Sequence, residues 1–480
     1  LPITTLNHYC DEYQSSGHLY VIRLDGKTRE EVNEFIRMME EDGVGMNVHY
    51  KPLPMHSAYK GLGFDIEDYP NSYDQFSNAA TLPLHTLLTD EQVEYVIQCV
   101  KKNMKRLNEN QPKKKVLILG VASVQMDAVI QLKEMGFETH AIAMAKDGPA
   151  ADEADYFEMI NILDEPAVID YIQKHDIDVV YSVGSDLAMP AACKISEKLD
   201  LPCFVSFDTA YICNHKNCMR ETLTLNCDGN VPYQVMEEPE EVIIKFPVIL
   251  KPSDAQGQRG IFLINSQEEL EEHFEEAKKF SRSSKVIVEK YIEGPEVSVN
   301  GYMVNGSLKF LAVSDRETWP QFTGLIHKHI VPAQTISEKA TARIWHIFED
   351  ACKRVGIQNG PVYFQMKVEG DQPYIIEMTP RLDGCHMWNI LSRSSGVNLI
   401  KLCFEHLIHG DTSELENLRD GLDPMEFVFF CQEPNTTMDR DRFTVPEEAE
   451  DHFWYYESGD HIRPVNGRYD KIGYYIQSID

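Results

Sequence analysis

One segment of the chain places a lysine and a glycine-bearing loop directly after an apolar run. Residues 246–250, Phe-Pro-Val-Ile-Leu, predict a buried strand that ends in Lys251. The following loop carries Gln256, Gly257, Arg259 and Gly260. A triphosphate needs a fixed cation and backbone N–H groups that small residues leave accessible. Because Lys251 precedes the glycines, this is not the Walker sequence, and an exposed hairpin turn explains the segment alone equally well.

A second segment, residues 286–300, predicts a buried strand, a short hinge and a second strand. Glu289 closes the first apolar run, Gly294 and Pro295 interrupt it, and Glu296 opens the second. A hinge leaves backbone N–H and C=O groups unpaired, and an adenine edge can satisfy them. Glu296 is then placed to accept both ribose hydroxyls. The alternative is that both glutamates are solvated charges at strand ends.

A third segment, residues 363–380, predicts two antiparallel strands joined by a short loop. Strand periodicity puts Glu377 and Thr379 on one face, with the residue between them on the other. Gln365 on the paired strand joins them in an oxygen-only cluster suited to Mg²⁺ bridged by phosphates. Arg381 then lies near the transferring phosphate, where its fork geometry suits oxyanions. A buried polar hairpin with an Arg–Glu pair is the alternative.

The elements that carry these residues change in type along the chain and predict several domains. Residues 1–110 predict a small α+β domain, and the polar stretch 111–115 predicts a linker. From 116 to 206, strands alternate with helices, which indicates a doubly wound parallel sheet of Rossmann type. Its expected strands are Val116–Gly120, His140–Met144, Asp176–Ser182 and Pro202–Val205.

The rest of the chain predicts an α+β arrangement. Residues 207–410 have paired strands around Val248, Val286, Val297 and Val362, with long helices at 266–280 and 337–355. Residues 411–480 alternate aromatic and polar groups and predict a strand-rich cap. The expected fold class is therefore a multidomain mixture of α/β and α+β.

Composition narrows the classes of function. The 480 residues carry a net charge of −32, which argues against non-specific nucleic-acid binding. Eleven cysteines are scattered without a pairing pattern, and no apolar run approaches the ~20 residues of a membrane span. We therefore expect a cytoplasmic protein with no nucleic-acid or membrane partner. Because the first residue is Leu1, we also expect the chain to be the carboxy-terminal part of something longer.

In this order, the three segments resemble the ATP-grasp superfamily, specifically its carboxylate–amine ligase branch. The resemblance covers residues 114–410 and extends towards 480, and its four features include a lysine before the lid, Lys216. It implies a Rossmann-like subdomain, a lid and a central β-rich subdomain that clamp ATP. It also implies a small carboxylate and an amine as substrates, whose identities the sequence leaves open.

The resemblance implies a role for each matching residue. Lys216 and Lys251 contact phosphates, and the 254–260 loop folds over them with Gln256, Gly257, Arg259 and Gly260. Adenine meets the hinge, and the metal Mg²⁺ (or Mn²⁺) meets the hairpin. The hinge residues are Glu289, Lys290, Tyr291 and Ile292, with Glu296 at ribose; the metal residues are Gln365, Glu377 and Thr379; and the catalytic residues are Lys251 and Arg381.

Two positions depart from the family pattern. Gln365 stands where the family usually has Glu, and Thr379 stands where it usually has Asn. Glu377 is then the sure anionic metal ligand. The implied chemistry is attack of a carboxylate on the γ-phosphate, followed by attack of an amine on the acylphosphate. The loop from Trp319 to His329 is expected to border the acceptor site. Biotin-carboxylase-like carboxylation and a nucleotide-binding module without turnover are the alternatives.

Residues 17–106 resemble the carboxy-terminal small domain of PLP-dependent aminotransferases that act on nucleotide-linked keto sugars. The resemblance rests on His18–Arg23, on Gly45–His56 with its His49-Tyr50-Lys-Pro52 motif, and on Leu82–His85. The large domain with the Schiff-base lysine is lacking, so we expect no PLP and no transamination in this chain. The family often builds its sugar-nucleotide pocket across a dimer interface, which is compatible with a homodimer. A role in amino-sugar or surface-polysaccharide biosynthesis is the corresponding hypothesis.

Overall fold

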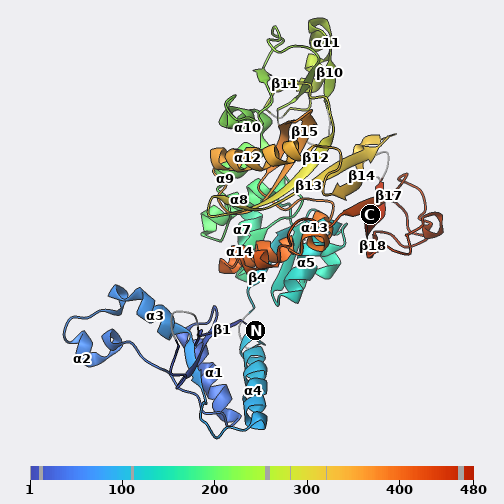
Figure 1. Ribbon diagram of the computed structural model, residues 1–480. Helices are drawn as coiled ribbons and strands as arrows, with labels where there is room; N and C mark the ends of the chain where they lie inside the picture. The colour runs from blue at the N-terminus through green and yellow to red at the C-terminus, as the bar shows by residue number, and fades with distance from the viewer. Residues whose placement is uncertain are drawn as a thin grey trace. The chain divides into compact units, whose positions relative to one another are not determined.

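A computed structural model describes residues 2–9, 14–109, 113–253, 260–281, 283–320, 322–462 and 470–479. The chain forms two compact units, residues 1–113 and 114–480 (Figure 1). None of the helices within the described ranges is long and apolar enough to cross a membrane. The mixed α/β and α+β architecture predicted from the sequence is confirmed, as the sheets below show.

The first unit is a small α+β fold. Its antiparallel sheet has the order β1-β2-β3, with β1 Ile3–Thr5, β2 Tyr20–Leu24 and β3 Ala79–Leu82. The longer helices are α1 Arg29–Glu41 and α4 Asp90–Glu109, and the shorter ones are η1 Leu53–Met55, α2 Ser57–Lys60, η2 Ile66–Asp68 and α3 Pro70–Ser77. A capping box between Thr28 and Glu31 begins α1. Buried residues of α1 and α4, such as Phe35 and Met104, form the core with β2.

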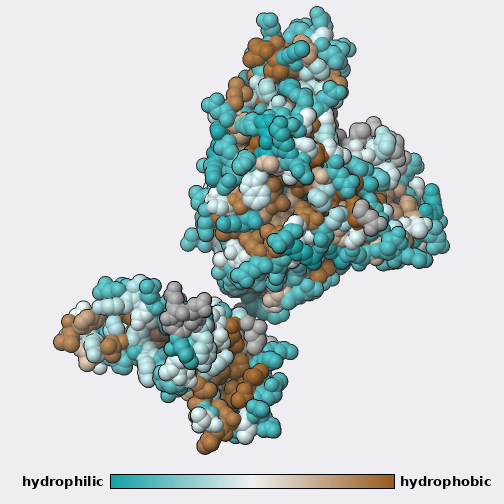
Figure 2. Space-filling model, viewed as in Figure 1, coloured by the Kyte–Doolittle hydropathy of each residue, from teal (hydrophilic) through white to brown (hydrophobic). Residues whose placement is uncertain are grey.

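Apolar side chains are exposed on this unit, as the brown areas of its surface show (Figure 2). Leu62 is 74% exposed and Leu87 is 82% exposed, and Tyr50 of the His49-Tyr50 motif is 75% exposed.

The second unit begins with a four-stranded parallel sheet. Its order is β6-β5-β4-β7, with β4 Lys115–Leu119, β5 Glu138–Ala143, β6 Tyr156–Met159 and β7 Val179–Tyr181. The connecting helices are α5 Ser123–Glu134, α6 Ala150–Glu153, α7 Glu165–His175 and α8 Ala188–Leu199. Alternate residues of β4 point to opposite faces of the sheet. Val116 packs in one core with residues of α5, and Leu117 packs in a second core with residues of α7.

The prediction of a strand at Pro202–Val205 is wrong. Pro202 has no backbone N–H to donate to a sheet, and Ser206 caps helix α9, Phe207–Asn214, immediately afterwards. The sheet instead includes β6, which the sequence did not indicate. Its four residues are partly or largely exposed, so they lack the apolar run that marks a buried parallel strand.

A smaller antiparallel sheet follows, which we call the lid sheet. Its order is β10-β9-β11-β8, with β8 Tyr233–Met236, β9 Val248–Pro252, β10 Phe262–Ile264 and β11 Val286–Lys290. Helix α11, Gln267–Lys278, covers it through Leu270 and Phe274, and helix α10, Lys216–Leu223, precedes it in the chain. The short lid strands therefore have their own small core.

An eight-stranded antiparallel sheet forms the centre of the second unit. Its order is β16-β15-β12-β13-β14-β17-β19-β18, with β12 Glu296–Val304, β13 Ser307–Trp319, β14 Phe322–Val331, β15 Gly360–Glu369, β16 Gln372–Thr379, β17 Met425–Gln432, β18 Asp451–Trp454 and β19 Asp470–Ser478. Its helices are α12 Glu338–Val355, α13 Met387–Ser395 and α14 Leu399–His409, with single turns η3 Ser413–Asn417 and η4 Arg440–Arg442. In the segment expected as a strand-rich cap, residues 411–480, strands β17, β18 and β19 extend this sheet beyond β14.

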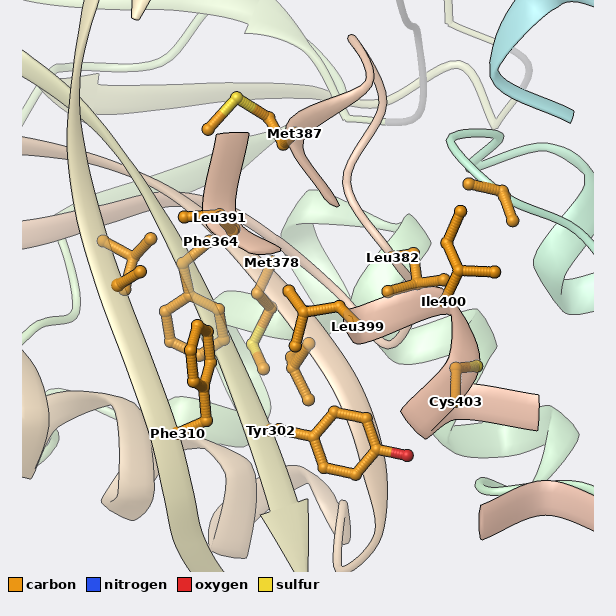
Figure 3. Close-up of a cluster of buried hydrophobic side chains, with 14 of the residues drawn as sticks. Tyr302, Phe310, Phe364, Met378, Leu382, Met387, Leu391, Leu399, Ile400 and Cys403 are labelled. Atoms are coloured by element: carbon orange, nitrogen blue, oxygen red, sulfur yellow. The ribbon is translucent and has the colours of Figure 1, made fainter. Parts of the chain in front are cut away.

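The core joins this sheet to the helices that follow it. Figure 3 shows Phe310, Phe364 and Met378 from the strands beside Leu391 and Leu399 from α13 and α14, all of which are buried. The parallel sheet contributes to the same cluster through Val116 and Ile118. Burying one such side chain stabilises a fold by about 1.5–3 kcal/mol, so these contacts hold the strands that carry the site in fixed register.

Candidate active site

Helix α10 delivers two cations to the end of the lid sheet. The backbone N–H of Lys216, its first residue, donates to the carbonyl of Ser253 at 3.0 Å, just beyond strand β9. Arg220 lies one turn later, and its side chain is 0% exposed. Residues four apart on a helix share a face, so both side chains point into the same region.

Lys251, near the end of β9, lies against a buried carboxylate. Its ammonium donates to Oε2 of Glu289 at 2.6 Å, and Nε of Arg220 donates to Oε1 of the same carboxylate at 2.9 Å. Each of these side chains is at most 5% exposed. A buried charge persists only when it is paired and hydrogen-bonded. Two cations share one carboxylate here, so this trio carries one excess positive charge that an anion can neutralise.

The trio shifts the pKa values of its members. Burial lowers the pKa of Lys251 to about 8; Glu289 opposes this shift, and the positive charges of Arg220 and Lys216 add to it. Burial by itself raises the pKa of Glu289, but Arg220 and Lys251 outweigh it and bring that pKa down to about 2. Glu289 therefore stays ionised at neutral pH. Its carboxylate lies in the ion network, and its contact with adenine stays a prediction.

We expect nucleotide affinity to fall as the pH rises through about 8. In its predicted role Lys251 would bind phosphate as an ammonium, and its lowered pKa of about 8 means that this charge is lost above that pH. An unperturbed lysine would keep its charge to about pH 10.4. The pH profile of kcat/KM for ATP reports groups of the free enzyme, so it should show an alkaline limb near the lower value. Lys251→Arg should move that limb upward, and a wild-type limb near pH 10 would contradict the assignment.

The hinge after β11 keeps part of its backbone available. The N–H of Lys290 donates to the carbonyl of Pro232 at 2.9 Å, and that of Tyr291 donates to Pro247 at 3.2 Å. In the described part of the chain, the N–H of Ile292 has no hydrogen-bond partner. Gly294 follows at φ +140°, where a Cβ would lie 2.0 Å from the carbonyl oxygen of Val368, so only glycine fits. The hinge therefore has a fixed path and a free donor for a base edge.

Gln365 and Glu377 face each other across the β15–β16 hairpin, as the sequence predicts. They are direct register partners, with a bulge next to them, and Tyr363 is the partner of Thr379. The ammonium of Lys216 lies 3.8 Å from Oε1 of Glu377. The lysine on α10 and the acid on β16 thus meet at one point.

The donor set fits a metal ion that shares its ligands with phosphate. Among the residues the structure describes, no three His, Cys, Asp or Glu side chains gather closely enough to hold a metal alone. Mg²⁺ is commonly bound by one or two carboxylates together with substrate phosphates and water. The carboxylate of Glu377 and the amide oxygen of Gln365 fit that pattern, and the hydroxyl of Thr379 is the weakest member of the predicted set.

Glu296 begins β12 beside the same hairpin. Nε2 of Gln365 donates to its Oε1 at 2.7 Å, and Arg316 of β13 forms an ion pair with that oxygen. The side chain is 27% exposed, so solvent or a ligand reaches it. Its contact with a ribose stays a prediction.

Arg381 is held by the parallel-sheet part of the unit. Its Nε donates to Oδ1 of Asp186 at 2.7 Å, and its guanidinium lies 5.6 Å from the centre of the Tyr363 ring. The backbone also meets here, because the N–H of Gly184 donates to the carbonyl of Leu382 at 3.3 Å. The sequence analysis considered an Arg–Glu pair within the hairpin as the alternative. Among the described residues, Arg381 instead forms its ion pair with an aspartate, Asp186.

Two further titratable groups lie near these residues. Burial raises the pKa of Asp383 to about 6 against the opposing charge of Arg381, and Asn300 donates to this carboxyl at 3.4 Å. His329 of β14 is 1% exposed, and its Nε2 has no hydrogen-bond partner in the described structure. Burial, followed by the charge of Arg316, holds the pKa of His329 well below its usual range. His329 is therefore neutral at pH 7, while the raised pKa of Asp383 lies at about 6.

The glycine-bearing loop is described only at its end. Gln256, Gly257 and Arg259 lie outside the described residues, whereas Gly260 has φ +70° and a Cβ there would lie 2.7 Å from the Phe280 ring. Sequence reasoning missed Arg220, Asp186, Arg316 and Asp383. The four-residue spacing of Arg220 from Lys216 was a readable signal, but no local pattern indicated the others.

Comparisons with known proteins cover both units. Residues 244–388 match the model of the ATP-grasp domain, and residues 2–101 match that of the DegT/DnrJ/EryC1/StrS aminotransferase family. The L-amino acid ligase from Bacillus licheniformis superposes with a TM-score of 0.65 at 20% identity, covering 77% of this chain and 94% of that one. At this identity the likeness shows the fold alone.

Two curated relatives share parts of the sequence. The carbamoyl phosphate synthase large chain of Methanoculleus marisnigri is 23% identical over 326 residues, 62% of this chain but 30% of the relative. A spore coat polysaccharide biosynthesis protein of Bacillus subtilis is 31% identical over 96 residues, 19% of this chain and 24% of that protein. The chain thus spans less than a third of either relative. In this chain, residues 244–388 are thus similar to ATP-grasp domains, and residues 2–101 are similar to the DegT/DnrJ/EryC1/StrS aminotransferase family.

Proposed function

We propose that residues 114–480 form an ATP-dependent carboxylate–amine ligase. One observation carries the proposal: the lysines of the lid side and the acid of the hairpin belong to one connected network. Lys251 reaches Glu289, Arg220 joins Glu289 to the carbonyl of Ile376, and Lys216 reaches the neighbouring Glu377. A phosphate chain placed there would meet cations from one side and a metal-binding acid from the other.

In this proposal each residue binds or orients a part of the substrates. Lys216 and Lys251 neutralise phosphate oxygens, and the N–H of Ile292 and the carboxylate of Glu296 orient the nucleoside. Gln365 and Glu377 would hold Mg²⁺, which supplies further neutralisation of the phosphate charge. Arg381, which Asp186 holds in place, would neutralise charge on the acyl phosphate.

The proposed reaction has two steps. An oxygen of the substrate carboxylate attacks the γ-phosphorus, the bond to the β-phosphate oxygen breaks, and ADP leaves an acylphosphate behind. The amine nitrogen then attacks the acyl carbon, loses a proton, and expels inorganic phosphate as the C–O bond breaks. Positioning and charge neutralisation account for catalysis of such phosphoryl transfers.

The relatives support the proposal at different levels. The L-amino acid ligase shares the fold over 77% of this chain, which is consistent with amide-bond formation. The aminotransferase-family segment and the spore coat polysaccharide relative favour an amino sugar or a sugar-linked amine as acceptor. We therefore propose a role for this ligase in amino-sugar or surface-polysaccharide biosynthesis.

We expect hydroxylamine to trap the activated carboxylate. Hydroxylamine competes with the natural amine for an acylphosphate and yields a hydroxamate, so hydroxamate should appear with one ADP per product. The measurement is a panel of amino acids and other carboxylates, with MgATP and hydroxylamine, followed by colorimetric hydroxamate and coupled ADP readout. Omission of Mg²⁺ or of the carboxylate should abolish both signals.

The same panel separates the alternatives. ADP release stimulated by bicarbonate, without any hydroxamate from other carboxylates, would indicate the carboxylase-like reaction. Tight nucleotide binding with no substrate-stimulated ADP release across the panel would indicate a binding module without turnover.

A further inference from the structure

Arg220 connects the parts of the proposed site that come from different elements. Its Nε donates to Glu289 of β11 at 2.9 Å, one terminal nitrogen donates to Asn230 at 3.1 Å, and the other donates to the carbonyl of Ile376 in β16 at 3.4 Å. The side chain is completely buried. A planar guanidinium can hold several acceptors in fixed directions at once, which an ammonium cannot do.

A second set of bonds fixes the arginine itself. The amide of Asn230 donates to the carbonyl of Arg220 and to that of Thr224, each at 3.0 Å. Arg220 is therefore braced through both its side chain and its backbone. Such a residue holds its partners in place and does not reach for a ligand.

We propose that Arg220 is a positioning residue for the nucleotide, a role that rests on the proposed function. It holds one oxygen of Glu289, so that the single negative charge of this carboxylate is shared between Arg220 and Lys251, and it connects the lid sheet to the strand that carries Glu377. The phosphate-binding lysine and the metal-binding acid are thereby kept in register.

Three charged groups face Lys251. These are Glu289 from β11 and the two cations of α10, Arg220 and Lys216. Without Arg220, Glu289 and Lys251 would form a one-to-one buried ion pair with no excess positive charge. Such a pair strengthens in a low-dielectric interior and competes with phosphate for the ammonium. Strands β11 and β16 would also lose the side chain that hydrogen-bonds to both of them.

The first test measures nucleotide binding without turnover. In calorimetric titrations, Arg220→Gln should bind MgADP about 10- to 100-fold more weakly than wild type. This is the loss expected when one charge-assisted contact, here that of Lys251 with a phosphate oxygen, is weakened. Arg354→Gln is the matched control, because Arg354 also braces the end of α10, through the carbonyl of Leu223 at 3.0 Å, but pairs with Asp350. The control should bind like wild type.

A double-mutant cycle separates positioning from folding. If Arg220 acts through Glu289, the same Arg220→Gln change should cost less than about 3-fold in a Glu289→Gln background, since no carboxylate is left to neutralise Lys251. In Arg220→Gln alone, Glu289 keeps Lys251 as its cation, 2.6 Å away, so no buried carboxylate is left unpaired. Thermal unfolding of each variant checks that it is folded.

The outcomes are distinct. No MgADP binding by wild type would remove the proposed function and this role with it. Wild-type binding with equal affinity in Arg220→Gln would overturn the positioning role alone. So would an equal loss in both backgrounds of the cycle, because Arg220 would then act independently of Glu289.

Discussion

Replacing Lys251 with methionine is expected to lower kcat/KM for ATP by about 100- to 1000-fold. A lysine charge about 4 Å from a phosphate charge gains roughly 4 kcal/mol at an effective dielectric of 20, and each 1.4 kcal/mol corresponds to a factor of ten. The fold should tolerate the change, because Glu289 keeps Arg220 as its cation at 2.9 Å. Steady-state kinetics with ATP as the varied substrate, together with thermal unfolding, measure both effects.

The matched control for this change is Lys339→Met. Lys339 pairs with Asp371 at 2.9 Å on an exposed surface, where a salt bridge contributes little. It should keep wild-type kinetics. A Lys251→Met protein that is folded and turns over ATP within about 3-fold of the control would exclude Lys251 from phosphate binding.

Replacing Glu377 with glutamine is expected to abolish most Mg²⁺-dependent turnover, by about 100-fold or more. Removal of one group that stabilises transition-state charge typically costs that much. The change keeps the size of the side chain but removes the carboxylate that lies 3.8 Å from Lys216 and faces Gln365. The variant should also need more Mg²⁺ for half-maximal rate, because its metal site has lost its negative charge. Rates measured over a Mg²⁺ titration at saturating ATP test both statements.

Asp371→Asn is the control for this charge removal. Asp371 lies at the turn of the same β15–β16 hairpin and contacts Ser337 and Lys339. The same loss of one negative charge there should leave the Mg²⁺ dependence unchanged. Equal Mg²⁺ curves for Glu377→Gln and wild type would exclude Glu377 as a metal ligand.

Local sequence patterns were enough to predict part of the site. The apolar run before Lys251 and the paired runs around Glu377 are strong strand signals, and hairpin pairing places Gln365 opposite Glu377 without knowledge of the rest of the fold. The hinge followed from glycine and proline between two apolar runs, and Gly294 has no room for a side chain. In each case the residues that decide the geometry are near one another in sequence.

The part that could not be predicted depends on long-range contacts. Arg381 meets Asp186 across 195 positions, and Arg220 meets Glu289 across 69. No periodicity reports such pairings. The same limit explains the error at Pro202–Val205, where a short apolar stretch is followed by a helix cap, and the omission of β6, whose residues are largely exposed.

The contacts of Arg381 and α10 also set the limits of any truncated version of this protein. The ATP-grasp match begins at residue 244, yet Lys216 and Arg220 precede it and Asp186 lies further upstream. The bond from Gly184 to Leu382 joins the two regions through the backbone as well. A catalytic fragment cut at the family boundary would leave Glu289 without its arginine and Arg381 without its carboxylate. A fragment that keeps this set and the whole second unit starts before strand β4, at about residue 114.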